Sequence, residues 1–201
     1  TVKALKNAAV QSTDEQNTQG VYVIINPETG SPVAELMYAG WDKLNEILGG
    51  ALPISNASVA NQDIINAVKA QGGVVDSTNH SRGSMTFVNG LGDMNRQGAT
   101  NLPIGTATFN GAAANAQQAA NLVEIVSGGK GAVQYATHQT DLVPKIVGGN
   151  PPTGGNANYG FPESHSSYGP NVEDGISDKA WGEGNHSVPV IVTPTNKATA
   201  P

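Results

Sequence analysis

The serine best placed for chemistry in this chain is Ser81. A run rich in β-branched residues leads into it, Gly83 follows two positions later, and a segment with helical spacing begins at once. This order of strand, sharp turn and helix strains the serine backbone and lifts its hydroxyl above the end of a sheet, as in a nucleophile elbow. We therefore take Ser81 as a candidate nucleophile. The alternative is a helix N-terminus capped by Ser81 or Asn79.

Asn79 departs from the usual pattern of such turns, in which a glycine stands two residues before the serine and another two residues after it. Asn adopts unusual backbone angles more readily than most residues, but it is bulkier than Gly. The second glycine position is kept by Gly83. We expect this glycine to let the following helix pack closely.

A serine hydroxyl is a weak nucleophile unless a base removes its proton, and the base needs a carboxylate that orients it. In α/β-hydrolases the chain order is serine, then acid, then histidine. Asp141 follows the second strand expected beyond Ser81, so it is the candidate acid. An aspartate that caps the backbone of its own turn is the alternative.

The candidate base is one of two histidines. Of the four in the chain, His80 lies inside the elbow, where its side chain is expected to point elsewhere, and His138 is too close to Asp141 in sequence. His165 and His186 each lie on a loop after Asp141, and chain order does not separate them.

Strand direction favours His165 over His186. His165 lies on the long irregular loop 148–170, which can reach over a sheet edge, whereas His186 comes two residues before the last expected strand. Active loops of a parallel sheet gather at the carboxyl ends of its strands. If that last strand is parallel, His186 lies at the opposite end.

An oxyanion hole is the second requirement of acyl-transfer chemistry. One donor is expected to be the backbone N–H of Arg82, the residue after the nucleophile. The second is expected from the loop 26–31, which follows an earlier strand, with Asn26 as the candidate.

Composition limits the classes of function. The 201 residues suffice for one domain, and neither a signal peptide nor an apolar run of about 18 residues is visible. Lys and Arg number 10 against 16 Asp and Glu, and cysteine is absent. The low basic content weighs against nucleic-acid binding. His138, Asp141, His165 and His186 lack the spacing of metal ligands, so no metal or cofactor is expected.

Strands alternate with helices along the chain. The expected strands are residues 21–25, 73–78, 106–110, 132–137 and 188–192, and the expected helices are about 32–48, 61–71, 83–96 and 112–126. This alternation predicts an α/β fold: a mainly parallel sheet of about five strands, with helices on both faces. We expect one domain over residues 21–193, a leader or linker at 1–20 and a tail at 194–201.

Several segments share their order with one known group of proteins. They are Asn26-Pro27 through Pro32-Val33-Ala34-Glu35-Leu36, Asn79-His80-Ser81-Arg82-Gly83-Ser84-Met85-Thr86, Phe109-Asn110-Gly111-Ala112, Asn115-Ala116-Gln117-Gln118-Ala119, Asp141-Leu142-Val143-Pro144 and Ile146 to Gly155. Together they resemble the C-terminal region of filamentous-haemagglutinin-type exoproteins, which include contact-dependent growth inhibition toxins and related bacterial adhesins. The resemblance covers roughly residues 20–193. Its members often carry Gly where this chain has Asn79.

The segments around Ser81, Asp141 and His165 also look like those of α/β-hydrolase lipases, in which an Asp-x-Val-Pro turn supplies the acid. The resemblance implies a reduced α/β-hydrolase-like fold and a triad of these three residues. It also implies a secreted or cell-surface toxin domain of a larger bacterial exoprotein, delivered into target cells, that hydrolyses a lipid or phospholipid ester. Its implied partner is a cognate immunity protein. The alternatives are a non-catalytic hydrolase-like scaffold and, less favoured, a nuclease toxin.

Overall fold

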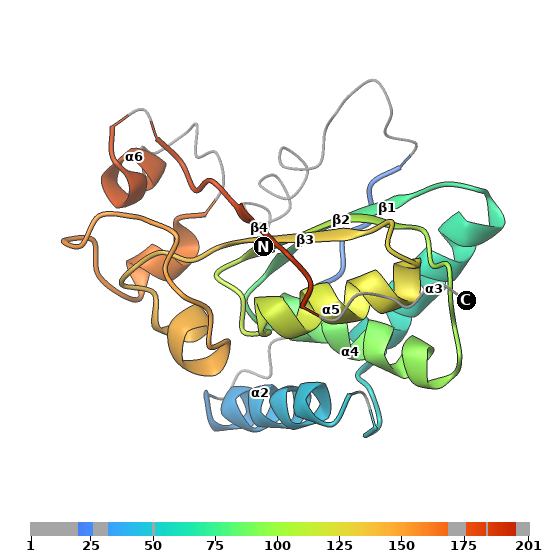
Figure 1. Ribbon diagram of the computed structural model, residues 1–201. Helices are drawn as coiled ribbons and strands as arrows, with labels where there is room; N and C mark the ends of the chain where they lie inside the picture. Colours follow the sequence, from blue (N-terminus) through green and yellow to red (C-terminus); the bar gives the residue numbers. More distant parts are fainter. Residues whose placement is uncertain (1–19, 26–31, 50, 169–175, 184, 196–201) are drawn as a thin grey trace.

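A four-stranded sheet is the centre of the structure, a computed structural model that describes residues 20–25, 32–49, 51–168, 176–183 and 185–195. The strands are β1 (Val75–His80), β2 (Ile104–Asn110), β3 (Ala132–Ala136) and β4 (Val190–Val192), and they lie in this order across the sheet (Figure 1). β1, β2 and β3 are parallel, and β4 is antiparallel to β3. The expected α/β class with a mainly parallel sheet is confirmed.

Five α-helices accompany the sheet in the described residues. They are α2 (Pro32–Ile47), α3 (Asn56–Ala70), α4 (Arg82–Arg96), α5 (Ala116–Ser127) and α6 (Ile176–Trp181), joined by a π-helix (Val143–Val147) and a 3₁₀-helix (Glu163–Ser166). α3, α4 and α5 lie on one face of the sheet (Figure 1). In the described part of the chain, this one-sided cover differs from the expected helices on both faces.

Local sequence sets the ends of the helices. The side chain of Ser55 accepts a hydrogen bond from the N–H of Ser58 and so caps α3, and Asn115 caps α5 through the N–H of Gln118. α5 ends at Gly128, whose φ of 67° lies in the left-handed region that glycine enters at low cost.

The core lies between the sheet and helices α4 and α5. Phe109 of β2 meets Phe87 of α4 edge-on, with ring centroids 6.3 Å apart. Leu91 of α4, Val123 of α5 and Val133 of β3 are buried in the same cluster. The alternation of apolar side chains along β2 and β3 therefore turns one face of the sheet toward these helices.

The expected buried strand at residues 21–25 is wrong. These residues form no strand, and Val21, Tyr22, Val23 and Ile25 are exposed. A β-branched run indicates a strand only when a neighbouring strand pairs with its backbone. Among the described residues, β1 thus forms one edge of the sheet, which has four strands instead of about five.

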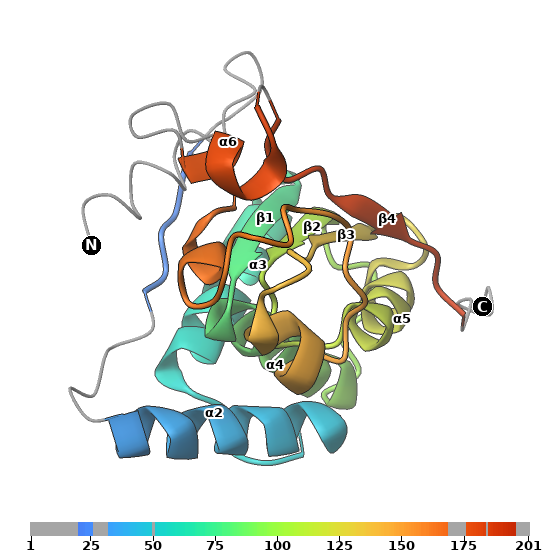
Figure 2. The ribbon, with the colours of Figure 1, turned by 90° about the vertical axis from the view of Figure 1, so that its left-hand side faces the viewer.

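The direction of β4 corrects the strand argument against His186. Val190 lies opposite Tyr135 and Val192 opposite Val133, so the chain enters β4 at the carboxyl end of β3. His186 therefore lies at the same end of the sheet as the loops that follow β1, β2 and β3. In Figure 1 the segments after β3 (orange) gather at this end, which faces the viewer in Figure 2.

The proposed domain limits fall partly outside the described residues. Residues 1–19, most of the expected leader, and residues 196–201, most of the expected tail, lie outside the described residues. Thr195, at the start of the expected tail, donates from its main-chain N–H to the side chain of Asn121 at 2.8 Å. The first residues of that tail therefore pack on α5.

Candidate active site

Ser81 occupies a strained turn between β1 and α4. Its φ is 52° and its ψ is −127°, a combination that non-glycine residues rarely adopt. The carbonyl of Ser81 accepts three hydrogen bonds: from the N–H of Ser84 at 3.1 Å, from the hydroxyl of Ser84 at 2.6 Å and from the N–H of Ala113 at 3.2 Å. These contacts hold a conformation that costs about 1–3 kcal/mol on its own.

The helix-cap interpretation of this turn is weakened by the side chains. Ser81 stands at the N-cap position of α4, but its hydroxyl makes no capping hydrogen bond. Asn79 lies within β1, opposite Phe109, and its amide donates to the hydroxyl of Ser77 at 3.0 Å. The strain of the turn therefore falls on Ser81, and the Asn in place of Gly at position 79 is ordinary strand backbone.

Gly83 does not provide the close helix packing that the sequence led us to expect. A Cβ added at Gly83 would meet no atom within 4 Å, whereas one added at Gly90 would lie 3.0 Å from the carbonyl oxygen of Ser58. The close approach of α4 to α3 is therefore made at Gly90, two turns further along the helix.

Asp141 and His165 form a hydrogen-bonded pair. Nδ1 of His165 donates to Oδ2 of Asp141 at 2.8 Å, although 24 residues separate them. Asp141 is fully buried, and its Oδ1 accepts from the N–H of Val143 at 3.0 Å. The bond from Asp141 fixes the orientation of the His165 ring and assigns the proton to Nδ1, which leaves Nε2 as the nitrogen for base chemistry.

Tyr168 is a third member of this group that the sequence did not single out as a ligand of Asp141. Its hydroxyl donates to Oδ2 of Asp141 at 2.7 Å and accepts from the N–H of His138 at 2.9 Å. Burial raises the pKa of Tyr168, so its phenol stays protonated and remains a donor. A tyrosine three residues after a candidate base was the available signal.

The end of β2 brings the serine turn and the Asp141–His165 pair together. The N–H of Ser81 donates to the carbonyl of Asn110 at 3.2 Å, and Gly111 follows with φ of 56°. A Cβ added at Gly111 would lie 3.1 Å from Oδ2 of Asp141 and 3.2 Å from Nδ1 of His165. Ser81 after β1, Asp141 after β3 and His165 on its loop therefore lie at the same end of the sheet, around the end of β2.

The remaining candidate residues are placed elsewhere or serve other contacts. His186 is exposed, and the aspartate is paired with His165 instead. Asn26, the expected second oxyanion donor, lies outside the described residues. His138 is fully buried, and its Nε2 donates to the carbonyl of Ala180 at 2.7 Å, so it ties the β3 end to α6.

Arg82 begins α4, which places its backbone N–H in the first helical turn, where an anion is favoured. Its side chain turns toward α2. The guanidinium lies 5.9 Å from the ring centre of Tyr38, and Nε lies 4.0 Å from Oδ2 of Asp42. Burial raises the pKa of the Asp42 carboxyl, and the charge of Arg82 opposes that rise.

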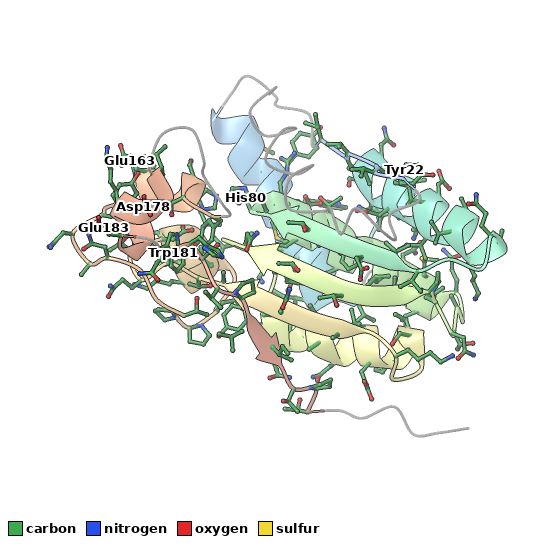
Figure 3. All side chains as sticks on the ribbon, turned by 90° about the horizontal axis from the view of Figure 1, so that it is seen from above. Tyr22, His80, Glu163, Asp178, Trp181 and Glu183 are labelled. Carbon is green, nitrogen blue, oxygen red and sulfur yellow. The ribbon has the colours of Figure 1, made fainter. Side chains whose placement is uncertain are left out.

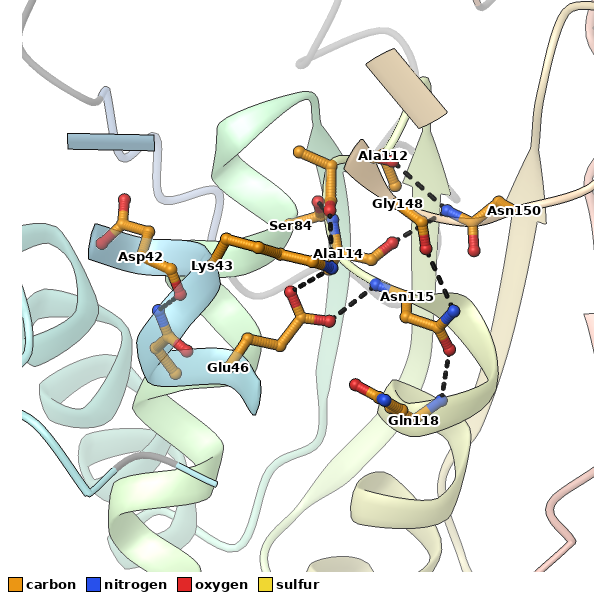
Figure 4. A network of polar contacts seen from close by, with 12 residues as sticks. Asp42, Lys43, Glu46, Ser84, Ala112, Ala114, Asn115, Gln118, Gly148 and Asn150 are labelled. Atoms are coloured by element: carbon orange, nitrogen blue, oxygen red, sulfur yellow. Dashed lines mark hydrogen bonds and ion pairs between the residues drawn. The ribbon is translucent and has the colours of Figure 1, made fainter. Parts of the chain in front are cut away.

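A polar network fixes the loop 111–115 (Figure 4). The carboxylate of Glu46 accepts from the N–H of Asn115 at 2.7 Å and from Lys43 at 2.9 Å. The amide of Asn150 donates to two carbonyls of the same loop, at 3.2 and 2.8 Å. Because the N–H of Ala113 in this loop also donates to the Ser81 carbonyl, the network helps to hold the serine turn.

Two kinds of site are not found in the described part of the chain. No three His, Asp or Glu side chains gather there as ligands for a metal ion. None of the helices described is both long and apolar enough to span a bilayer.

Comparison of the chain with protein-family models, with curated proteins and with solved structures gives no match.

Proposed function

We propose that this chain is a serine hydrolase of ester bonds, with Ser81 as nucleophile, His165 as general base and Asp141 as the acid that orients it. One observation carries the proposal. The 2.8 Å hydrogen bond between Asp141 and His165 lies at the sheet end where the strained turn presents Ser81. A nucleophile, a base and an orienting acid in this relation are the requirements of covalent acyl transfer.

The reaction follows from the roles of the atoms. Nε2 of His165 takes the proton of the Ser81 hydroxyl as Oγ attacks the ester carbonyl carbon, and Asp141 stabilises the imidazolium. The backbone N–H of Arg82 donates to the oxyanion. The alcohol then leaves with the proton from His165, and water repeats the sequence to release the acid and restore Ser81.

An apolar acyl group is the substrate that the surroundings favour. Leu142 and Ile146 are exposed on the segment after Asp141, at 43% and 74%. Phe161 is exposed as well, and its ring centre lies 6.4 Å from that of His165. Exposed apolar side chains on the two segments that carry Asp141 and His165 suit a lipid or phospholipid ester.

The biological setting of the proposal rests on the resemblance of the motifs to exoprotein toxins. We propose a secreted or cell-surface toxin domain that is delivered into target cells. A producing cell then needs protection from the hydrolase, which makes a cognate immunity protein the expected partner.

Labelling with a fluorophosphonate probe tests the proposal, because the probe reacts with an activated serine. We expect the wild-type chain to be labelled and Ser81→Ala to lose both labelling and ester hydrolysis. Ser77→Ala, four residues earlier and within the strand that leads to Ser81, is the matched control and should behave as wild type. Hydrolysis of p-nitrophenyl esters of increasing acyl length then tests the preference for an apolar acyl group.

One feature favours the alternative of a non-catalytic scaffold: among the described residues, β1, which leads into the serine turn, lies at an edge of the sheet. A wild-type chain that is folded and unlabelled would establish this alternative. Labelling that persists in Ser81→Ala would place the nucleophile elsewhere.

A further inference from the structure

His80 lies against the proposed general base, contrary to the expectation that its side chain points elsewhere. The ring centroids of His80 and His165 are 4.7 Å apart, and the planes are tilted by 41°. Nε2 of His80 lies 2.8 Å from the backbone carbonyl oxygen of His165. A carbonyl oxygen can only accept, so Nε2 of His80 carries a proton and donates it to this bond.

The bond joins two segments that are far apart in the sequence. His80 is the last residue of β1, and His165 lies on a 3₁₀-helix of four residues within a long loop. Figure 3 shows His80 at the end of its strand, on the side of the segments that carry Glu163 and Trp181. A short helix in a long loop has little stability of its own, so contacts from the rigid sheet must define its position.

We propose that His80 is a positioning residue: its Nε2–H holds the main chain of His165, and its ring supports the His165 imidazole, so that Nε2 of His165 stays aimed at Ser81. The inference rests on the proposed hydrolase function. Asp141 fixes the His165 ring at Nδ1, and His80 fixes the backbone from which that ring extends. Two anchors on opposite parts of the residue define both the place and the orientation of the base.

The protonation state of the His80 ring fits this positioning role. His165 faces its ring directly, Tyr168 lies 6.0 Å away between ring centres, and Asp141 adds a negative charge nearby. His80 keeps solvent on one side, but loss of solvent on the other, together with the charge that His165 can carry, lowers the pKa of His80 to about 4. His80 is therefore neutral near pH 7 and does not oppose the imidazolium that forms on His165 during the reaction.

The test compares His80→Phe with His80→Gln in the full chain. Phe keeps a ring but has no donor, whereas the amide of Gln restores an N–H at nearly the same reach. We expect His80→Phe to lower kcat by about 10- to 100-fold, the effect of a misplaced catalytic group, with KM changed less than threefold. His80→Gln should recover most of kcat. A purely structural role would lower the melting temperature of both variants and would not produce this rescue.

The outcomes separate this inference from the proposed function. If the fluorophosphonate labels the wild type and a folded His80→Phe variant at the same rate, the positioning role is overturned and the hydrolase proposal stands. Loss of kcat in both variants also overturns the donor role of His80. An unlabelled, folded wild-type chain overturns the hydrolase proposal and the positioning role with it.

Discussion

Gly111→Ala should damage the Asp141–His165 pair although neither of the two residues is substituted. Gly111 follows β2 with φ of 56°, in the left-handed region. An added Cβ would lie 2.8 Å from Cε2 of Tyr168, 3.1 Å from Oδ2 of Asp141 and 3.2 Å from Nδ1 of His165. The first distance is shorter than a Cβ contact can be, and the other two press on the hydrogen bond itself. The new methyl group therefore pushes the tyrosine and the pair outward.

The size of the effect has two parts. An alanine in the left-handed region costs roughly 1–2 kcal/mol, and an extra methyl group in a packed interior costs roughly 1–3 kcal/mol. Gly72→Ala separates them, because Gly72 has a similar φ of 71° and no atom within 4 Å of an added Cβ. In Gly72→Ala the free energy of unfolding should fall only by the cost of an alanine in the left-handed region. Gly111→Ala should lose about 1–3 kcal/mol more.

Urea unfolding measures the stability of both variants, and ester hydrolysis with saturation kinetics measures their activity. We expect kcat of Gly111→Ala to fall by about 10- to 100-fold, because a small misplacement of a catalytic group has an effect of that order. Gly72→Ala should keep wild-type kcat. Equal stability and equal kcat in the two variants would refute the contact geometry at Gly111.

Three further predictions concern the groups around the base. Asp141→Asn should keep the fold and lower kcat by orders of magnitude, about 10⁴ in the best-studied serine protease; a loss below about tenfold in steady-state kinetics would make Asp141 a turn residue. Tyr168→Phe leaves the buried N–H of His138 unpaired, so the free energy of unfolding should fall by about 1–3 kcal/mol in urea titrations. Because the pKa of His80 is lowered to about 4, from 6.5 in the unfolded chain, its contribution to stability is full above pH 6.5 and is lost as the pH falls toward 4. The urea midpoint of the wild type should therefore fall as the pH is lowered from 6.5 to 4, and that of His80→Phe should fall less steeply. Equal dependence of the two midpoints on pH would contradict the lowered pKa of His80.

The sequence predicted helices α2 to α5 and strands β1 to β4 in their observed order, because most of the signals of these elements are local, but it did not predict α6. The β-branched runs and the helical spacing of apolar residues depend on near neighbours, whereas the helix starts capped by Ser55 and Asn115 differ from the expected starts at about 61 and 112. The strand, turn and helix around Ser81 also depend on near neighbours. The run 21–25 has the same local pattern as a buried strand but is exposed, because strand formation needs a partner that local sequence does not specify.

The candidate site was accessible from the sequence only in part. Chain order and turn chemistry brought Ser81, Asp141 and His165 forward, and the structure places these residues at one end of the sheet. His80 was set aside because its side chain was expected to point elsewhere, and Gly111 was not singled out, since the contacts of both join residues far apart in the sequence. The argument from a parallel last strand was wrong, because β4 pairs antiparallel with β3 and local sequence does not specify the direction of a strand pairing.

The division of the site among strand ends explains why a four-stranded sheet can carry it. Ser81 follows β1, Gly111 follows β2, and the turn that holds Asp141 follows β3, so three adjacent parallel strands define three of the positions. His165 is the exception, because it lies on a loop without a strand of its own. Its position therefore depends on bonds from those strand ends, through Asp141 and through His80. Variants that loosen these two bonds should lower the turnover number long before they unfold the sheet, because neither bond contributes to the core between β2, α4 and α5.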